Sequence, residues 1–175
     1  VVDGTGLKSR VEYNAVMSVA TEWGLPIAGK DVFLVCVFDR IGMGLAFEEL
    51  GCRMTYGDLM FATGIPIPLY KISSVHALAP IVMPWLTQLP FSWVYPTGKA
   101  QRANRDKAKK RKLKFQQYYN RAHVLAGDFH YIYRHLPERI DGKIIVTNTV
   151  TEDDVEDIGR RGAHALVTTS PEIQG

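Results

Sequence analysis

Five short apolar runs, separated by segments with helical periodicity, constrain the fold of this chain more than any other feature. Rich in branched and aromatic residues, they predict strands at 31–37, 52–58, 123–129, 143–149 and 163–169. Helices are predicted between them at 7–24, 41–51 and 151–162, with at least two more within 59–122. Because strands alternate with helices, we expect a three-layer, Rossmann-like α/β domain with a mostly parallel sheet of about five strands.

The length of 175 residues, 46% of them apolar, corresponds to about one domain with a sizeable core. We therefore interpret 1–175 as a single Rossmann-like, nucleotide-binding-type domain. Residues 1–29 form its lead-in helix and connector. Because the chain starts with Val1 and ends in a loop-like segment, we expect it to be part of a longer protein.

The predicted helix at 7–24 has a clear apolar face. Its members recur at helical spacing, and Gly24 marks the end of the helix. They are Val11, Ala15, Val16, Val19, Ala20 and Trp23.

No secretory signal and no membrane span is expected. The longest apolar region, 76–93, is interrupted by three prolines and lacks the ~20 apolar residues that a span needs. It reads as an amphipathic helix or a hydrophobic lid, and the wider segment 64–95 as either a homodimer surface or a lid. Cys36 and Cys52 lie within predicted strands and read as small core residues rather than metal ligands. We expect a cytoplasmic protein without a metal site.

Charge is segregated along the chain. Residues 99–114 hold nine Lys or Arg and one Asp, whereas the remaining residues carry 12 basic and 17 acidic side chains. A basic run can bind nucleic-acid phosphates, or an anionic cofactor or partner. Its Ala, Lys, Arg and Gln content favours a solvated helix, so we expect no nucleic-acid partner.

Each predicted strand ends in polar residues. In parallel sheets these ends lie along one edge, and ligands bind beyond them. Asp, His, Asn and Thr together suit a small polar ligand. The residues concerned are Asp39 and Arg40, Asp58, Asp128 and His130, Thr147 and Asn148, and Thr168 and Thr169.

The turn at 37–42 matches a dinucleotide fingerprint only in part. Gly42 and Ala46 correspond to its third glycine and following small residue, which permit close helix–strand packing, but Val37 and Asp39 occupy the first two glycine positions. Asp39 would face the pyrophosphate, although the helix N-terminus still attracts an anion and Arg40 offsets the acid.

Asp58 lies 16 residues after Gly42, at the end of the second strand. A carboxylate there can accept both ribose hydroxyls and would repel a 2′-phosphate, which favours NAD over NADP. The same residue could instead cap a helix starting at Leu59. We predict a cofactor site comprising Asp39, Arg40, Gly42, Asp58, Thr147 and Asn148.

Several segments resemble a known family. "VVDGTGLK", "GCRMTYGDLMFATGIPIPL", "LPFSWVYPTG", "AGDFHYIYRHLPE" and "LVTTSPE" are similar to a prokaryotic family labelled quinate 5-dehydrogenase, within the shikimate and quinate dehydrogenase superfamily. The resemblance implies oxidation of a cyclic hydroxy acid or polyol, with hydride passing to a nicotinamide. It also implies a Lys–Asp pair on the reacting hydroxyl, to which Asp3 supplies the Asp.

The candidate catalytic residues are Asp3, Lys8, Asp128 and His130. The superfamily Lys has no match here, but Lys8 lies near Asp3 in sequence. His130 beside Asp128 suits acid–base chemistry. Each has a structural alternative: Asp3 as a turn or N-cap residue, His130 as a packed or surface residue, and Thr147 and Asn148 as turn residues leading into the Thr151 cap.

Three hypotheses remain open. The first is an NAD-dependent dehydrogenase acting on a quinate-like substrate. The second is a divergent, non-catalytic Rossmann-like domain that binds a small polar molecule or serves as an interaction module, which Asp39 at the phosphate position favours. The third, weaker one is a methyltransferase-like domain with Asp58 on the ribose of S-adenosylmethionine.

Overall fold

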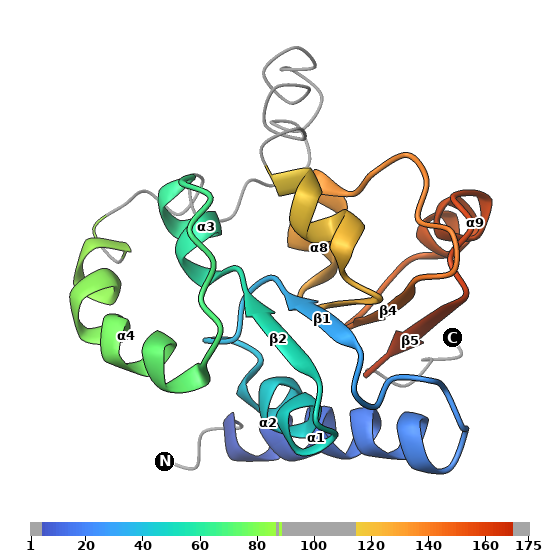
Figure 1. The fold of residues 1–175 in the computed structure, drawn as a ribbon, viewed down its shortest axis with the longest axis horizontal. Coiled ribbons are helices and arrows are strands. Elements are labelled where there is room, and N and C mark those ends of the chain that lie inside the picture. The colour runs from blue at the N-terminus through green and yellow to red at the C-terminus, as the bar shows by residue number, and fades with distance from the viewer. Residues whose placement is uncertain (1–4, 87, 89–114, 170–175) are drawn as a thin grey trace.

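The computed structural model describes residues 5–86, 88 and 115–169. Within them, five strands form one parallel sheet in the order β2-β1-β3-β4-β5 (Figure 1). The three-layer, Rossmann-like α/β fold is therefore confirmed. The strands are β1 (Asp31–Leu34), β2 (Arg53–Tyr56), β3 (Val124–Ala126), β4 (Ile144–Thr147) and β5 (Ala165–Thr168).

Each strand is shorter than the apolar run that predicted it. β1 ends at Leu34, although the buried chain continues and the Val35 amide still donates to the Ala126 carbonyl at 2.9 Å. Phe129, predicted at the end of the third strand, is the first residue of a helix. The apolar runs extend past the ladders because the turns that follow are themselves buried.

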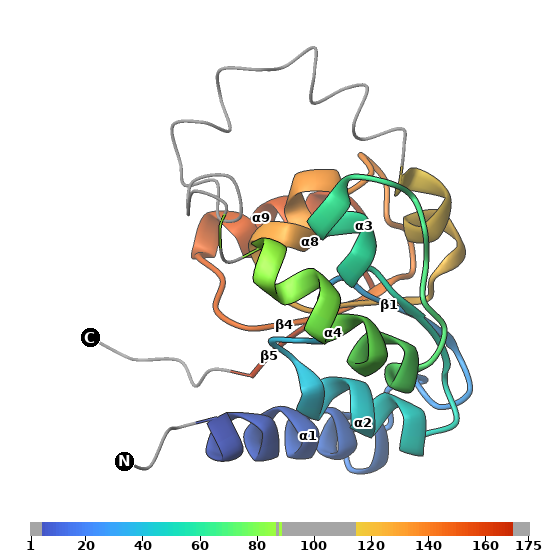
Figure 2. The same cartoon turned by 90° about the vertical axis from the view of Figure 1, so that its left-hand side faces the viewer.

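Helices cover both faces of the sheet, as Figure 2 shows from the side. α1, α2 and α4 contribute to one buried cluster of apolar side chains, and α3, α8 and α9 contribute to the other, together with the helical residues 115–121. The helices are α1 (Thr5–Thr21), α2 (Ile41–Glu49), α3 (Asp58–Thr63), α4 (Ile72–Leu86), α8 (Phe129–His135) and α9 (Glu152–Arg160).

The alternation of β1 side chains explains the two cores. Val32 and Leu34 belong to the cluster with α1 and α2. Phe33 and Val35 belong to the cluster on the opposite face. A strand buried on both sides in this way is typical of a parallel sheet.

The predicted apolar face of α1 is partly wrong. Val16 and Val19 are buried as expected, but Val11 and Trp23 are 44% and 75% exposed. The buried stripe instead continues one turn earlier to Glu12, which is 2% exposed. A charged residue therefore occupies a core position of this helix, where it needs a partner.

The predicted start of the last helix is confirmed. Thr151 is the N-cap of α9, and its side chain and that of Asp154 form a capping box. Three acidic residues lie in the first turn of α9, where they interact favourably with the helix dipole.

Other predictions concern segments that the structure describes only in part. Asp3 and residues 99–114 lie outside the described residues, as do 89–95. No described helix is both long and apolar enough to span a bilayer. Both cysteines are half-buried and unbridged, and the Cys52 thiol lies 3.3 Å from the Ile27 carbonyl oxygen.

Candidate functional site

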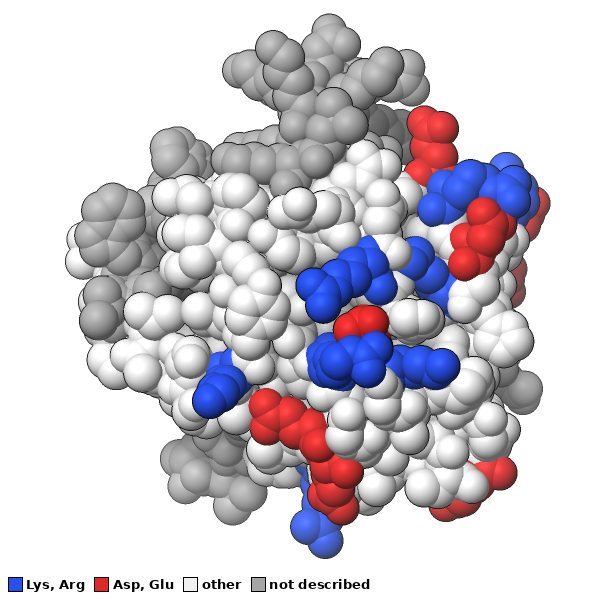
Figure 3. All heavy atoms as spheres, viewed as in Figure 1, with Lys and Arg blue, Asp and Glu red and all other residues white. Residues whose placement is uncertain are grey.

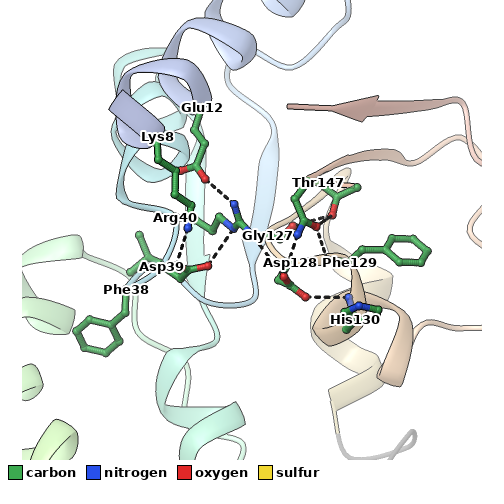
Figure 4. Close-up of polar contacts among 12 residues, drawn as sticks. Lys8, Glu12, Phe38, Asp39, Arg40, Gly127, Asp128, Phe129, His130 and Thr147 are labelled. Carbon is green, nitrogen blue, oxygen red and sulfur yellow. Dashed lines mark hydrogen bonds and ion pairs between the residues drawn. The ribbon is translucent and has the colours of Figure 1, made fainter. Parts of the chain in front are cut away.

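The strand order places a topological switch point between β1 and β3. β1 leads to α2 on one face of the sheet, and β3 leads to α8 on the other. In doubly wound sheets ligands bind beyond the carboxyl ends of the strands at such a point. Polar residues that follow β1, β3 and β4 converge there (Figure 4).

Arg40 lies at the centre of this group and is only 5% exposed. Its Nη1 donates to Oε1 of Glu12 on α1 at 2.6 Å, and its Nη2 donates to Oδ2 of Asp128 at 3.4 Å. Its Nε lies 3.4 Å from Oδ2 of Asp39. One guanidinium therefore links α1, the β1–α2 turn and the β3–α8 turn. We call Glu12, Asp39, Arg40 and Asp128 the Arg40 network.

Lys8 and Asp39 form the solvent-facing part of the site. The Lys8 Nζ donates to Oδ1 of Asp39 at 2.6 Å, and the two side chains are 40% and 44% exposed. Lys8 lies one helical turn before Glu12 on α1, so both project toward the same turn of the sheet (Figure 4). This pair is the part of the site that a ligand can reach.

Beyond β3 and β4, side chains close the N-terminus of α8. Asp128 is its N-cap and accepts the His130 amide at 3.0 Å, while Oδ1 of Asn148 accepts the Phe129 amide at 3.1 Å. Nδ2 of Asn148 donates to Oδ2 of Asp128 at 3.0 Å, and the Thr147 hydroxyl lies 3.1 Å from Oδ1 of Asn148. The polar residues predicted after these two strands are thus bonded to one another.

Asp58 turns inward, toward the end of β1. Its Oδ1 accepts the amides of Val37 at 2.8 Å and Phe38 at 3.1 Å, while its buried Oδ2 makes no hydrogen bond among the described residues. The alternative that Asp58 caps the next helix is wrong, because Gly57 is the N-cap of α3 and Asp58 is its first residue. A ribose role for Asp58 stays a prediction.

Gly42 permits a close contact, but not the expected one. A Cβ at Gly42 would lie 2.7 Å from the Ser9 carbonyl carbon, so this glycine lets α1 and α2 approach. The contact between helix and strand belongs to Gly44, where a Cβ would lie 2.8 Å from Cγ2 of Val37. The predicted helix–strand role of Gly42 is therefore wrong.

Burial shifts the pKa values of the interior acids upward. Burial raises the pKa of Glu12, although the hydrogen bond and charge of Arg40 oppose this. Burial also raises the pKa of Asp58, against the hydrogen bonds from Phe38 and Val37. Burial alone would lower the pKa of Arg40, but its hydrogen bond to Glu12 outweighs that effect and raises it.

The site has little capacity left for an anion. Three carboxylates surround Arg40 and Lys8, so the exposed group carries a net negative charge when all are ionised. The backbone amides that could hold a phosphate already bind the protein's own side chains. They are those of Val37 and Phe38, which bind Asp58, and those of Phe129 and His130, which bind Asn148 and Asp128.

The sequence therefore identified most of the residues that meet here. The structure brings together Lys8, Asp39, Arg40, Asp128, Thr147 and Asn148. The side chain of His130 is exposed beside them. Glu12 was not predicted, although its position on the buried stripe of α1 was a usable signal. No cluster of three metal-ligating side chains occurs among the described residues.

A family model matches residues 6–175 of the chain, and its description reads "Domain of unknown function (DUF8754)". The chain belongs to this family. Neither the curated proteins nor the solved structures contain a match. The arguments for function therefore come from the site itself.

Proposed function

We propose that this domain binds a small, uncharged, hydroxyl-bearing ligand at the carboxyl edge of its sheet. Lys8 and Asp39 contact the ligand, with His130 at its side and the Arg40 network beneath. The observation that carries this proposal is the buried Arg40 guanidinium between Glu12 and Asp128, because it fixes three elements around one switch point. A binding surface on a rigid floor is what small-ligand sites require.

The charge of the site supports an uncharged ligand. Three carboxylates against two cations disfavour an anion, and the nearby amides have acceptors already. Hydroxyl groups, by contrast, can donate to Asp39 and accept from Lys8. A polyol would thus use both members of the exposed pair without a net change of charge.

Thermal unfolding of the full chain tests the proposal. The panel holds a cyclic polyol such as inositol, quinate, NAD, NADP and S-adenosylmethionine. A ligand at 100 times its dissociation constant adds about 2.7 kcal/mol, which raises Tm by roughly 5–10 °C in a domain of this size. We expect this with the polyol and not with the dinucleotides.

A matched pair of variants locates the binding. Lys8→Met with Asp39→Asn should abolish the shift. The control, Arg139→Met with Asp141→Asn, removes an exposed ion pair of the same 2.6 Å length just before β4, and should keep the shift. Equal shifts in both variants, or no shift with any compound in the parent, would refute the proposal.

An NAD-dependent dehydrogenase acting on a quinate-like hydroxy acid is the second candidate. The exposed Lys8–Asp39 pair favours it, because the resembling superfamily uses a Lys–Asp pair on the reacting hydroxyl. The β1–α2 turn does not fit the pyrophosphate of NAD, since Asp58 occupies its amides and Asp39 stands at its mouth. We therefore derive no hydride step from these residues.

Absorbance of reduced nicotinamide tests this second candidate directly. Full-length protein is mixed with quinate and NAD, with Lys8→Met as the comparison. Turnover by the parent that Lys8→Met abolishes would establish the dehydrogenase. No turnover, together with a polyol-induced Tm shift, would leave the binding domain as the function.

A further inference from the structure

The opposite edge of the sheet, where the strands begin, carries a second polar group. Arg53 is the first residue of β2, and Lys30 and Asp31 stand at the start of β1. The three remaining strands are each preceded by a basic residue. These residues are His123, Lys143 and His164.

Backbone hydrogen bonds show that these residues form one continuous row. The Arg53 amide donates to the Lys30 carbonyl at 2.9 Å, and the His123 amide donates to the Asp31 carbonyl at 2.8 Å. The next strand follows, since the Ile144 amide donates to the His123 carbonyl at 3.0 Å. The His164 amide donates to the Lys143 carbonyl at 2.8 Å. The row thus crosses the whole sheet, with neighbours about 4.8 Å apart.

Positive charge dominates this row. Lys30, Arg53 and Lys143 belong to it, and Arg121 ends the helical residues 115–121 beside it, against the single acid Asp31. The hydrogen bond and charge of Arg53, with the charges of Arg121 and His123, hold the pKa of Asp31 below its usual value. Figure 3 shows Lys and Arg side chains gathered over β1 and β2 around one acidic residue.

The composition makes this row unusual for the chain. Outside residues 99–114 the chain carries 12 basic against 17 acidic side chains. A random stretch of that surface would therefore be acidic on average. The cations of the row are concentrated, not a sample of the whole.

Two of the four cations are anchored and two are not. Arg53 binds Asp31 through Nε and Nη2, both at 2.9 Å, and Lys143 donates to the carbonyls of Asn120 and Ala122. Neither Lys30 nor Arg121 has a side-chain hydrogen bond within the described residues. Both are therefore available to a partner at no cost to the fold.

We propose that this row binds the phosphate backbone of a single-stranded nucleic acid without sequence preference. Cations at regular spacing along one line match an extended chain of phosphates. A membrane surface fits less well, because none of the large exposed apolar side chains of the described residues belongs to the row. The row also offers an acidic peptide no apolar pocket to fix its position.

The site is distinct from the basic run at 99–114, and it lies at the edge opposite the proposed ligand site. It therefore does not depend on the proposed function. The expectation that nucleic acid is not a partner concerned that run alone. The row was not visible in the sequence, because its members come from five separate segments.

Fluorescence anisotropy with a labelled single-stranded RNA of mixed sequence tests the proposal on the full chain. The affinity should fall as salt rises, with a log–log slope of about −0.7 for each phosphate contacted. Lys30→Glu with Arg121→Glu should weaken binding and reduce the slope by about 1 for each cation removed. Labelled polyglutamate and phosphatidylserine vesicles serve as alternative probes.

The matched control is Arg10→Glu with Lys71→Glu. It makes the same change in net charge at two exposed cations outside the row, and it should bind RNA as the parent does. Equal weakening in both variants would show that general charge, including the run at 99–114, is responsible and would overturn the proposal. So would absence of RNA binding at low salt, or binding of polyglutamate or vesicles as tight as that of RNA.

Discussion

Replacing Asp58 by Ala should destabilise the domain by about 2–3 kcal/mol. The carboxylate Oδ1 accepts two amides, those of Val37 and Phe38, and the residue is only 6% exposed. Each hydrogen bond to a charged group contributes about 1.5–3 kcal/mol. Part of that total is offset, because the variant no longer buries a charge whose Oδ2 has no hydrogen bond among the described residues. The loss of two acceptors outweighs this gain.

Asp58→Asn separates the hydrogen bonds from the charge. The amide oxygen of Asn can still accept from both backbone groups, while the buried charge disappears. We expect its free energy of unfolding to lie within about 1 kcal/mol of the parent at neutral pH. Urea denaturation of the parent and both variants, with equal m-values, gives the comparison.

The pH dependence has a defined sign. The pKa of Asp58 is raised in the folded state above the model value of 3.8, so between the two pKa values the folded protein binds more protons than the unfolded chain. This contribution to stability is present at low pH and is lost as pH rises from about 3.8 through the folded pKa. Relative to Asp58→Asn, the parent should therefore lose stability as pH rises through that window.

One result would refute this reasoning. If Asp58→Ala is as stable as Asp58→Asn, the two turn amides do not need the carboxylate as an acceptor. Amide hydrogen exchange gives an independent check, because the Val37 and Phe38 amides should exchange faster in the Ala variant and remain protected in the Asn variant.

Three further predictions can be checked by the same denaturation experiment. Gly42→Ala should cost at least about 2 kcal/mol, because its Cβ would lie 2.7 Å from a backbone carbon of α1, whereas Gly159→Ala in α9, with nothing within 4 Å, should stabilise by about 0.5–1 kcal/mol. Arg40→Met should cost about 3–5 kcal/mol, because it leaves buried carboxylates unpaired; Arg139→Met, in an exposed pair, should cost less than about 1 kcal/mol. Thr151→Ala should cost about 1 kcal/mol through the lost cap.

The sequence located the site because parallel strands leave little choice. Once β1, β3 and β4 run in one direction, the residues after them must lie along one edge, so Arg40, Asp128 and Asn148 were found from strand ends alone. Thr151 was equally accessible, since a helix cap depends on local sequence.

What the sequence did not reveal depends on contacts between distant segments. Glu12 lies in a helix that precedes the sheet, and nothing local indicates that Arg40 will meet it 28 residues later. Asp58 was placed at the right strand end but given the wrong direction, because the acceptor of the Val37 amide could not be known without the turn geometry. For the same reason Gly42 and Gly44 exchanged roles.

The two charged edges have a common physical origin. In a parallel α/β domain the helix N-termini point to the carboxyl edge of the sheet and their C-termini to the other, so the backbone itself favours anions at one edge and cations at the other. Asp58 and Asp128 meet the first demand by binding amides, and Lys143 meets the second by binding carbonyls. Charges beyond what the backbone uses then remain for partners. At the carboxyl edge these are Lys8 and Asp39, and at the amino edge Lys30 and Arg121, which is why each experiment targets those pairs.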